Sequence, residues 1–187
     1  MDAILREFPD CFESERLTIR CPRPGDGPEL NRAVLESWEE LRQWMPWADK
    51  KPAVEESEAN VRQAHLEFMA RRDMRLSLFL KGSQTMVGSS GLHRISWEVP
   101  SFEIGYWVRT PYAGRGFITE AVAAISDFAF ETLGARRVEI RCDARNERSA
   151  AVARRLHFAL EARLRNESRH HLSGEVRDTL VFALIWD

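Results

Sequence analysis

Two glycines, Gly114 and Gly116, have the spacing of an anion-binding turn. They stand between an aromatic and β-branched run, Ile104 to Val108, and an apolar-periodic segment that begins near Thr119. The first run predicts a strand and the second a helix. The first N–H groups of a helix have no helical partner, the helix dipole is positive there, and glycine lets a phosphate approach closely. The sequence from 103 to 130 therefore predicts a strand, a turn and a helix that together can bind an anion.

Two familiar phosphate-binding patterns do not fit this turn. A P-loop ends in Gly-Lys-Ser/Thr, whereas this chain reads Gly-Arg-Gly-Phe from Gly114 to Phe117. The dinucleotide pattern needs three glycines at set spacing in an early parallel-sheet unit. A tight turn that needs glycine for steric reasons alone is the alternative interpretation, and the short motif does not decide between the two.

The elements around the turn predict a mixed α/β domain that spans residues 1–187, with residues 1–13 as a loose lead-in. Alternation and turn residues predict strands over 16–21, 76–80, 86–92, 104–108, 136–142, 158–165 and 177–186. Helical periodicity predicts helices over 26–35, 39–45, 53–72, 119–130 and 146–156. This order is typical of one layer of sheet with helices on both faces.

An ordered set of short motifs resembles the GNAT acetyltransferases. The family's pyrophosphate loop, Gln/Arg-x-x-Gly-x-Gly/Ala, falls on residues 113–118, with Ala113 in place of Gln/Arg and Ile118 in place of a small residue. In this last position the chain resembles one branch of the family, the RimJ/RimL-type ribosomal-protein N-terminal acetyltransferases, which tolerate a larger apolar residue there. Further matches to that branch run through nearly the whole chain: Ser14-Glu15-Arg16-Leu17, Trp44-Met45-Pro46-Trp47, Asn146-x-x-Ser149 and Gly174-x-x-x-Asp178.

The resemblance implies a GNAT-type fold, whose mostly antiparallel sheet contains a splayed strand pair. It implies that the strand carrying Val108 diverges from the strand carrying Arg141, and that the pantetheine arm of acetyl-CoA lies in the gap. The residues expected to contact the cofactor are Trp107, Val108, Arg109, Ala113, Gly114, Arg115, Gly116, Phe117, Ile118, Thr119, Asn146 and Ser149.

Acetyl transfer to an amine needs a base for the amine and a donor for the departing thiolate, but no covalent nucleophile. Glu103 is the first candidate base, because partial burial would raise its pKa toward a useful value. The resemblance offers a second position in the last hairpin, where Ser168 aligns and Glu167 is adjacent. Asn146 has the residue type of a helix cap. Ser149, one turn later, is implied to assist the thiolate, since Ala153 stands where other members carry a tyrosine.

Three tryptophans, Trp38, Trp44 and Trp47, lie close to a proline break. Large aromatic residues are commonly core residues, yet such a cluster also suits the wall of a substrate groove. In the resembled family this is the acceptor-side segment. We therefore expect these tryptophans to contact the substrate, with Glu36, Glu39 and Glu40 nearby to attract an ammonium group.

Bulk composition narrows the class of protein. A formal net charge of −2 does not suit a strongly basic nucleic-acid binder. The sequence has no long uncharged apolar run, so no membrane helix is expected. Three scattered cysteines suit a reducing cytoplasm. Cys142, inside a strand pattern, is expected to be buried. Two adjacent histidines, His170 and His171, would point to opposite faces of a strand, so we expect surface or groove positions and no metal.

These observations predict a cytoplasmic N-acetyltransferase that moves the acetyl group of acetyl-CoA to a primary amine. The N-terminal α-amine of a protein such as a ribosomal protein is the expected acceptor. A polyamine or aminoglycoside acetyltransferase, and a sensor that binds acyl-CoA without turnover, are the alternatives. No nucleic-acid or membrane partner is expected, and self-association into a homodimer stays open.

Overall fold

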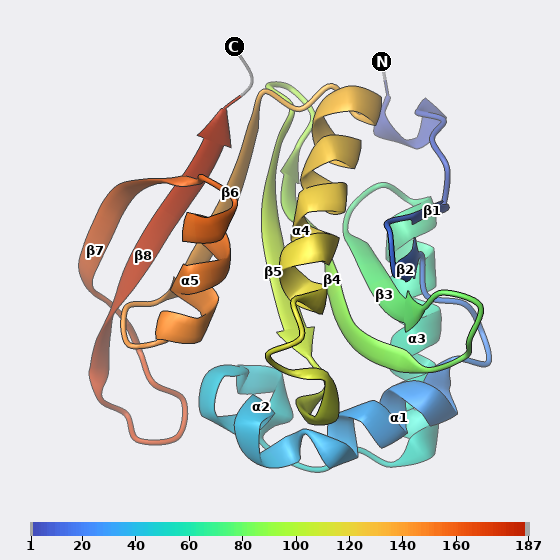
Figure 1. Ribbon diagram of the computed structural model, residues 1–187, viewed down its shortest axis with the longest axis horizontal. Helices are drawn as coiled ribbons and strands as arrows, with labels where there is room; N and C mark the ends of the chain where they lie inside the picture. The colour runs from blue at the N-terminus through green and yellow to red at the C-terminus, as the bar shows by residue number, and fades with distance from the viewer. Residues whose placement is uncertain (1, 186–187) are drawn as a thin grey trace.

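The computed structural model describes residues 2–185 and shows one eight-stranded sheet in the order β1-β2-β3-β4-β5-β6-β8-β7 (Figure 1). Its strands are β1 (Cys11–Glu13), β2 (Leu17–Arg20), β3 (Met74–Leu80), β4 (Met86–Ser96), β5 (Ser101–Val108), β6 (Arg137–Asp143), β7 (Ala159–Arg169) and β8 (Val176–Ile185). Every neighbouring pair is antiparallel except β5 and β6. This confirms the expected mixed α/β architecture and its mostly antiparallel sheet.

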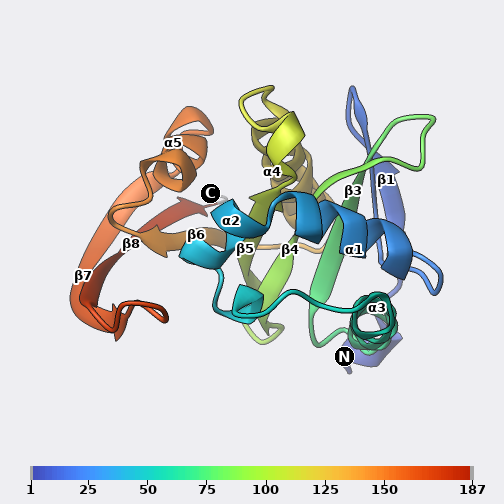
Figure 2. The same ribbon diagram turned by 90° about the horizontal axis from the view of Figure 1, so that it is seen from below.

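Five α-helices surround the sheet within the described residues: α1 (Gly27–Glu36), α2 (Trp38–Trp44), α3 (Val54–Met69), α4 (Phe117–Asp127) and α5 (Glu147–Arg155). Short 3₁₀ turns are η1 (Ala3–Leu5), η2 (Pro46–Ala48) and η3 (Thr110–Tyr112), and α4 continues into the π-helical turn η4 (Phe128–Thr132). Figure 2 shows α4 and α5 on one face of the sheet and α3 on the other, with α1 and α2 across one end. Helices therefore cover both faces, as predicted.

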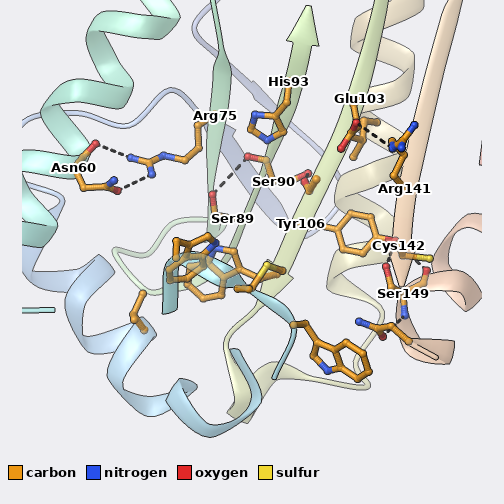
Figure 3. A pocket seen from close by; sticks show the side chains of 18 of the residues that line it. Asn60, Arg75, Ser89, Ser90, His93, Glu103, Tyr106, Arg141, Cys142 and Ser149 are labelled. Atoms are coloured by element: carbon orange, nitrogen blue, oxygen red, sulfur yellow. Dashed lines mark hydrogen bonds and ion pairs between the residues drawn. The ribbon is translucent and has the colours of Figure 1, made fainter. Parts of the chain in front are cut away.

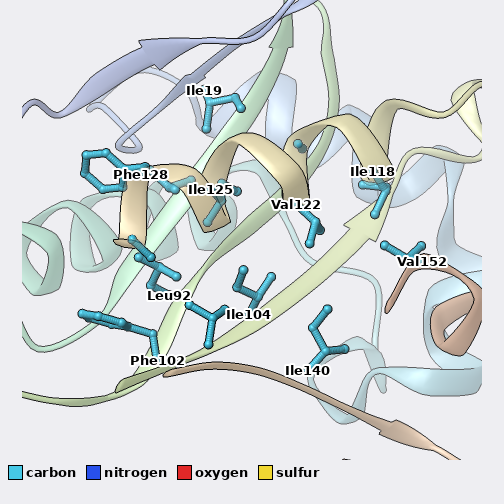
Figure 4. Close-up of a cluster of buried hydrophobic side chains, with 14 of the residues drawn as sticks. Ile19, Leu92, Phe102, Ile104, Ile118, Val122, Ile125, Phe128, Ile140 and Val152 are labelled. Atoms are coloured by element: carbon cyan, nitrogen blue, oxygen red, sulfur yellow. The ribbon is translucent and has the colours of Figure 1, made fainter. Parts of the chain in front are cut away.

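Helix α4 is the central element of the hydrophobic core (Figure 4). Its side chains Ala121, Val122 and Ile125 are fully buried against the sheet, because apolar residues at this spacing share one helix face. Burying one such aliphatic side chain contributes roughly 1.5–3 kcal/mol. The helix begins at Phe117, two residues earlier than expected, because Gly116 adopts a left-handed φ of 81° as its N-cap. The core thus fixes the position of the glycine turn.

The N-terminal segment corrects the expectation of a loose lead-in. Residues 3–5 form η1, and β1 pairs antiparallel with β2. Phe8 and Phe12 pack on the core beside Phe128, and the Phe12 and Phe128 rings stack 4.6 Å apart. These contacts join residues more than 100 positions apart, so local patterns do not reveal them.

The last hairpin is longer than expected, since β7 runs to Arg169 rather than 165. Its register shifts between Leu164 and Ser168, where Asn166 takes a left-handed φ of 54°. The expected end of β8 at Trp186 lies outside the described residues. Among the described helices, none is long and apolar enough to cross a membrane.

Candidate active site

Strands β5 and β6 form a fork. They pair in parallel over three positions, ending at Glu103 and Glu139, and then diverge. Beyond that point β5 still pairs with β4 as far as Val108, and β6 still pairs with β8 as far as Asp143. The predicted splay is therefore present, and it begins at the candidate base.

A cavity of about 930 Å³ opens at this fork, and it is lined from both faces of the sheet (Figure 3). Side chains alternate along a strand, so Glu103 and Gly105 face α3, whereas Tyr106 faces α5. Tyr106 indeed reaches Ser149 of α5, and Glu103 pairs across the sheet with His93. The cavity thus passes through the sheet, with one half on the α3 face and the other beside α5.

Glu103 has the surroundings of a general base. Its side chain is only 18% exposed, and its Oε2 atom is buried without a hydrogen-bond partner among the described residues. Arg94 Nε lies 3.3 Å from Oε2 and Arg141 Nε lies 4.0 Å from it. Burial raises the pKa of the Glu103 carboxyl, and the two arginines oppose the rise. The free oxygen can accept a proton, as the sequence interpretation requires.

The alternative base position is less suitable. Glu167 lines the cavity, but its Oε1 accepts a hydrogen bond from Arg141 at 2.7 Å and its Oε2 accepts one from Thr179 at 2.8 Å. Ser168, which aligns with the family position, accepts a hydrogen bond from Arg177 Nε at 2.8 Å. Because both Glu167 oxygens are engaged, Glu103 is the stronger candidate.

A pair of hydroxyl groups occupies the α5 side of the fork. Ser149 Oγ donates to Tyr106 Oη at 3.1 Å, and Tyr106 Oη donates to the Ser149 carbonyl at 2.9 Å. Asn146 caps α5, as predicted, by accepting a hydrogen bond from the Ser149 N–H at 3.1 Å. Burial raises the pKa of the Tyr106 phenol, so it keeps its proton near neutral pH. Cys142 is buried here, and burial raises its thiol pKa.

The sequence patterns did not predict Tyr106 as a site residue, because no local pattern links β5 to α5. The available signal was alternation along β5, which sets Tyr106 on the face opposite Glu103. That face also receives the helix that starts at Asn146. The tyrosine that other members carry at position 153 is replaced here by buried Ala153, and Tyr106 supplies a phenol from the neighbouring strand.

The turn at residues 113–119 can hold a phosphate through its backbone. Gly114 and Gly116 have left-handed φ values of 74° and 81°, and their Cα atoms face open space except for Arg16 Nη2, 3.4 Å from a Cβ placed at Gly116. Gly116, the N-cap residue, provides no side-chain cap for the first N–H groups of α4. Phe117 and Ile118 are buried, so these residues can offer their backbone N–H groups rather than their side chains. The turn lies outside the lining of the fork cavity, at the start of the helix beside it.

The side chain of Arg109, a predicted cofactor contact, has a structural role. Its guanidinium is 7% exposed and forms 2.8 Å ion pairs with Glu29 and Glu36. It also donates to the Met86 carbonyl. The side chain is absent from the cavity lining, and its charge is already neutralised. Glu36 is likewise engaged and is not free to attract an ammonium group.

The predicted substrate tryptophans divide into two groups. Trp38 is 6% exposed and packs in the core with Val34, Leu41 and Ala48, which differs from the prediction. Trp44 and Trp47 line the cavity, and Trp47 is 51% exposed. The ring of Trp107, a predicted cofactor contact, lies 6.3 Å from the Trp47 ring and lines the same cavity.

The two histidines lie in the turn after β7 rather than on a strand. His170 Nε2 donates to the Gln43 carbonyl at 2.7 Å, and His171 Nε2 donates to the Arg42 carbonyl at 2.8 Å. Both bonds hold the tip of the last hairpin against the end of α2. Neither histidine lines the cavity, and both are partly exposed, so of the two expected positions the structure shows the surface and not the groove.

The splayed strands, the uncapped glycine turn and the buried carboxylate define the class of an acyl-CoA-dependent acyltransferase. Residues 16–159 match the family model described as acetyltransferase (GNAT) domain. The chain therefore belongs to the GNAT acetyltransferase family, and it is an acetyl-CoA-dependent N-acetyltransferase.

Several relatives have similar sequences over almost their whole length. YdaF of Bacillus subtilis (strain 168), a ribosomal N-acetyltransferase by its provisional name, is 27% identical over 176 residues, covering 94% of each chain. The ribosomal-protein-serine acetyltransferase of Escherichia coli (strain K12) is 25% identical, covering 93% of this chain and 95% of its own. The solved structure of RimL, a ribosomal L7/L12 alpha-N-protein acetyltransferase in complex with coenzyme A, superposes with a TM-score of 0.83 at 27% identity. The match covers 93% of this chain and 96% of the RimL chain.

The residues present fit acetyl-CoA. The open glycine turn and the free N–H groups of α4 suit its pyrophosphate. The edge of β5 from Ile104 to Val108, which β6 leaves unpaired, offers backbone groups to an amide-containing arm. When bound, acetyl-CoA supplies the acetyl group as an activated thioester.

Proposed function

We propose that this N-acetyltransferase modifies the N-terminal α-amine of a protein, with a ribosomal protein as the first candidate. The observation that carries the proposal is the buried Oε2 of Glu103, which accepts no hydrogen bond from the described residues, in a cavity that Trp44 and Trp47 line. A volume of about 930 Å³ suits the first residues of a peptide. The printed names of the E. coli relative and of RimL, which refer to ribosomal proteins, support the same class of acceptor.

An α-amine also suits a site with one carboxylate base. Its pKa is about 8, against about 10.4 for a lysine side chain. At pH 7 the neutral, nucleophilic fraction is therefore roughly 200-fold larger for the α-amine. Glu103 accepts the proton that the amine loses on attack, and its raised pKa brings it closer to that of the amine.

The Tyr106 and Ser149 hydroxyls serve as the acid side of the site in this proposal. They are hydrogen-bonded to each other, and they lie on the face of the sheet opposite Glu103. The phenol keeps its proton because burial raises its pKa. A proton can pass from Ser149 Oγ or Tyr106 Oη to a departing thiolate, and the other hydroxyl supports the donor.

Tyr106→Phe and Ser149→Ala are each expected to lower kcat by at least about 10-fold while raising KM for acetyl-CoA by less. General acids usually contribute a factor of about 10²–10⁴ to the rate. We expect a smaller loss of kcat here, because water can replace one hydroxyl. Steady-state thiol release measures both constants. Ser126→Ala, which removes a buried hydroxyl inside α4, is the control. Unchanged kcat in both variants would remove this pair from catalysis.

The acceptor is tested with two peptides of the same sequence. One has a free N-terminus and no lysine; the other has a blocked N-terminus and a free lysine. We expect thiol release and a single acetyl group with the first peptide, and at least about 10-fold slower release with the second. Faster modification of the blocked peptide, or rapid turnover of spermidine with neither peptide modified, contradicts the proposal. Binding of acetyl-CoA without thiol release in the presence of any of these amines supports the alternative of a sensor.

The charge of the cavity disfavours a polycationic acceptor. The cavity is lined by more cationic than anionic side chains, and one arginine among them has no carboxylate partner. A polyamine or aminoglycoside would bring further positive charge against it. The small-amine alternative is therefore the weaker of the two.

A further inference from the structure

The charged side chains of the cavity pair with one another, with one exception. Five cationic residues line it, together with four carboxylates. The pairs are Lys50 with Glu56 at 3.4 Å, Arg94 with Glu103 at 3.3 Å, Arg141 with Glu167 at 2.7 Å and Arg177 with Asp143 at 3.6 Å. Among the described residues that line the cavity, Arg75 is left without an acidic partner.

Arg75 is nevertheless held firmly. Its Nη1 donates to the Asn60 Oδ1 at 2.6 Å, and its Nη2 donates to the Asn60 carbonyl at 2.8 Å. These contacts use two of the five N–H donors of the guanidinium. The nearest acid along the strand, Asp73, is engaged with His93 Nδ1 at 2.7 Å. Burial lowers the pKa of Arg75, and the nearby charge of Asp73 opposes only part of this effect.

Arg75 and Glu103 lie on the same face of the sheet. Arg75 pairs with Gly91, and Gly91 pairs with Gly105, so the three positions form a row across β3, β4 and β5. Glu103 is two residues from Gly105 and therefore shares its face. This is the α3 face, opposite the Tyr106 and Ser149 hydroxyls. Arg75 lies on β3 and Glu103 on β5. The two strands are separated by two strand spacings, a distance of roughly 10 Å.

Between Arg75 and Glu103, two glycines of the sheet carry no side chain on this face. A Cβ at Gly91 would lie 2.7 Å from the Met74 carbonyl oxygen and 3.0 Å from His93 Nε2, and a Cβ at Gly105 would lie 3.2 Å from His93 Cδ2. The His93 ring therefore lies over bare backbone. Figure 3 shows His93 between Arg75 and Glu103, with Ser89 and Ser90 below it. The His93 ring is the side chain that lies between base and arginine, and the glycine backbone beneath it leaves room for that ring.

We propose that Arg75 is a specificity residue that binds an anionic group on the acceptor, a carboxylate or a phosphate, about 10 Å from the amine that reacts. A planar guanidinium with free donors matches either anion in a bidentate contact. An extended peptide advances about 3.3 Å per residue, and the length of the acceptor side chain covers the remaining distance, so the anion belongs to the second or third residue of the acceptor. The inference rests on the proposed function, since it assigns a substrate class to that acceptor site.

The test compares peptides that differ at one position. Three free-N-terminal peptides carry Glu, Gln or phosphoserine at residue 2, and a second set carries them at residue 3. We expect wild-type kcat/KM to be at least about 10-fold higher for an anionic peptide than for its Gln counterpart, mainly through KM. Preference for Glu identifies a carboxylate as the natural group, and preference for phosphoserine identifies a phosphate. Equal use of all three overturns the inference.

Variants assign the effect to Arg75. Arg75→Gln is expected to remove the preference while leaving kcat/KM for the Gln peptide within about 3-fold, and Arg75→Lys is expected to restore part of it. Arg72→Gln is the matched control, because Arg72 is exposed in the turn before β3 and pairs with Glu67. Unchanged acetyl-CoA affinity shows that each variant is folded. A preference that survives Arg75→Gln contradicts the assignment.

A binding measurement separates this inference from the proposed function. Calorimetry with the CoA-loaded protein reports peptide affinity without turnover. If the peptides are not acetylated but the anionic one binds wild type at least about 10-fold more tightly than Arg75→Gln, the proposed function fails and the Arg75 site stands. If the peptides are acetylated without an anion preference, the function stands and the Arg75 site fails. If they are neither acetylated nor bound, both fail.

Discussion

Replacing Glu103 by Gln should lower kcat by roughly 1,000-fold, while the affinity for acetyl-CoA stays close to that of the wild type. The amide cannot take the proton from the attacking amine, yet it fills the same space at the start of the fork. Thiol-release kinetics measure kcat, and calorimetry measures the affinity. Glu167→Gln is the matched comparison, because it removes the other carboxylate near Arg141 and should cost much less. If Glu167→Gln is inactive and Glu103→Gln is active, Glu167 is the base and the assignment of Glu103 is wrong.

The same substitution should change the pH profile. Burial raises the pKa of Glu103, and the residue acts only when it is deprotonated. The kcat/KM of the wild type should therefore fall as the pH drops through this raised pKa, above the usual range of a glutamate carboxyl. Protonation of the acceptor amine adds its own limb near pH 8, which the substitution does not affect. If the Glu103→Gln variant still shows the fall in kcat/KM at acidic pH that we assign to Glu103, a group other than Glu103 causes that fall.

Gly116→Glu should weaken acetyl-CoA binding by roughly 100-fold or more. The new carboxylate would stand at the N-terminus of α4 and repel a pyrophosphate, at a cost of about 4 kcal/mol for unit charges 4 Å apart near a protein surface. A non-glycine residue is also strained at a φ of 81°. Calorimetry with acetyl-CoA is the measurement.

Two variants separate charge from strain at this position. Gly82→Glu also places a glutamate at a left-handed glycine, with a φ of 71° and open space around it, but in the turn between β3 and β4. It should lose stability without losing affinity for acetyl-CoA. Gly116→Ala should show an intermediate loss of affinity. A folded Gly116→Glu protein with wild-type affinity would show that the turn does not hold the cofactor.

Local patterns predicted the order of elements from β2 onward, because each element has its own periodicity and end signals. They also predicted the glycine turn and the Asn146 cap, since both depend on residues within a few positions. The family resemblance added the fork, which no single strand pattern indicates. The acetyltransferase class followed from the combination of these features.

Long-range partners decided what the sequence did not predict. Arg109 is neutralised by Glu36 and Glu29, which lie 73 and 80 positions away. Trp38 and Trp47 look alike in the sequence, but the packing of α1 against α2 buries the first and leaves the second exposed. Arg75 differs from the other cationic side chains of the cavity, each of which pairs with a carboxylate, and three of these four pairs join residues on separate strands.

We expect cofactor and acceptor to enter from opposite faces of the sheet, the cofactor beside α4 and α5 and the acceptor on the α3 face, and to meet at the fork between β5 and β6. Amide hydrogen exchange, followed by mass spectrometry, tests this expectation most directly. Coenzyme A alone should slow exchange in residues 104–108 and 117–119. Addition of an anionic free-N-terminal peptide should then slow exchange in residues 44–60, beside Trp44, Trp47 and Asn60. Protection of residues 44–60 by coenzyme A alone, with no effect at 104–108 or 117–119, would contradict this arrangement.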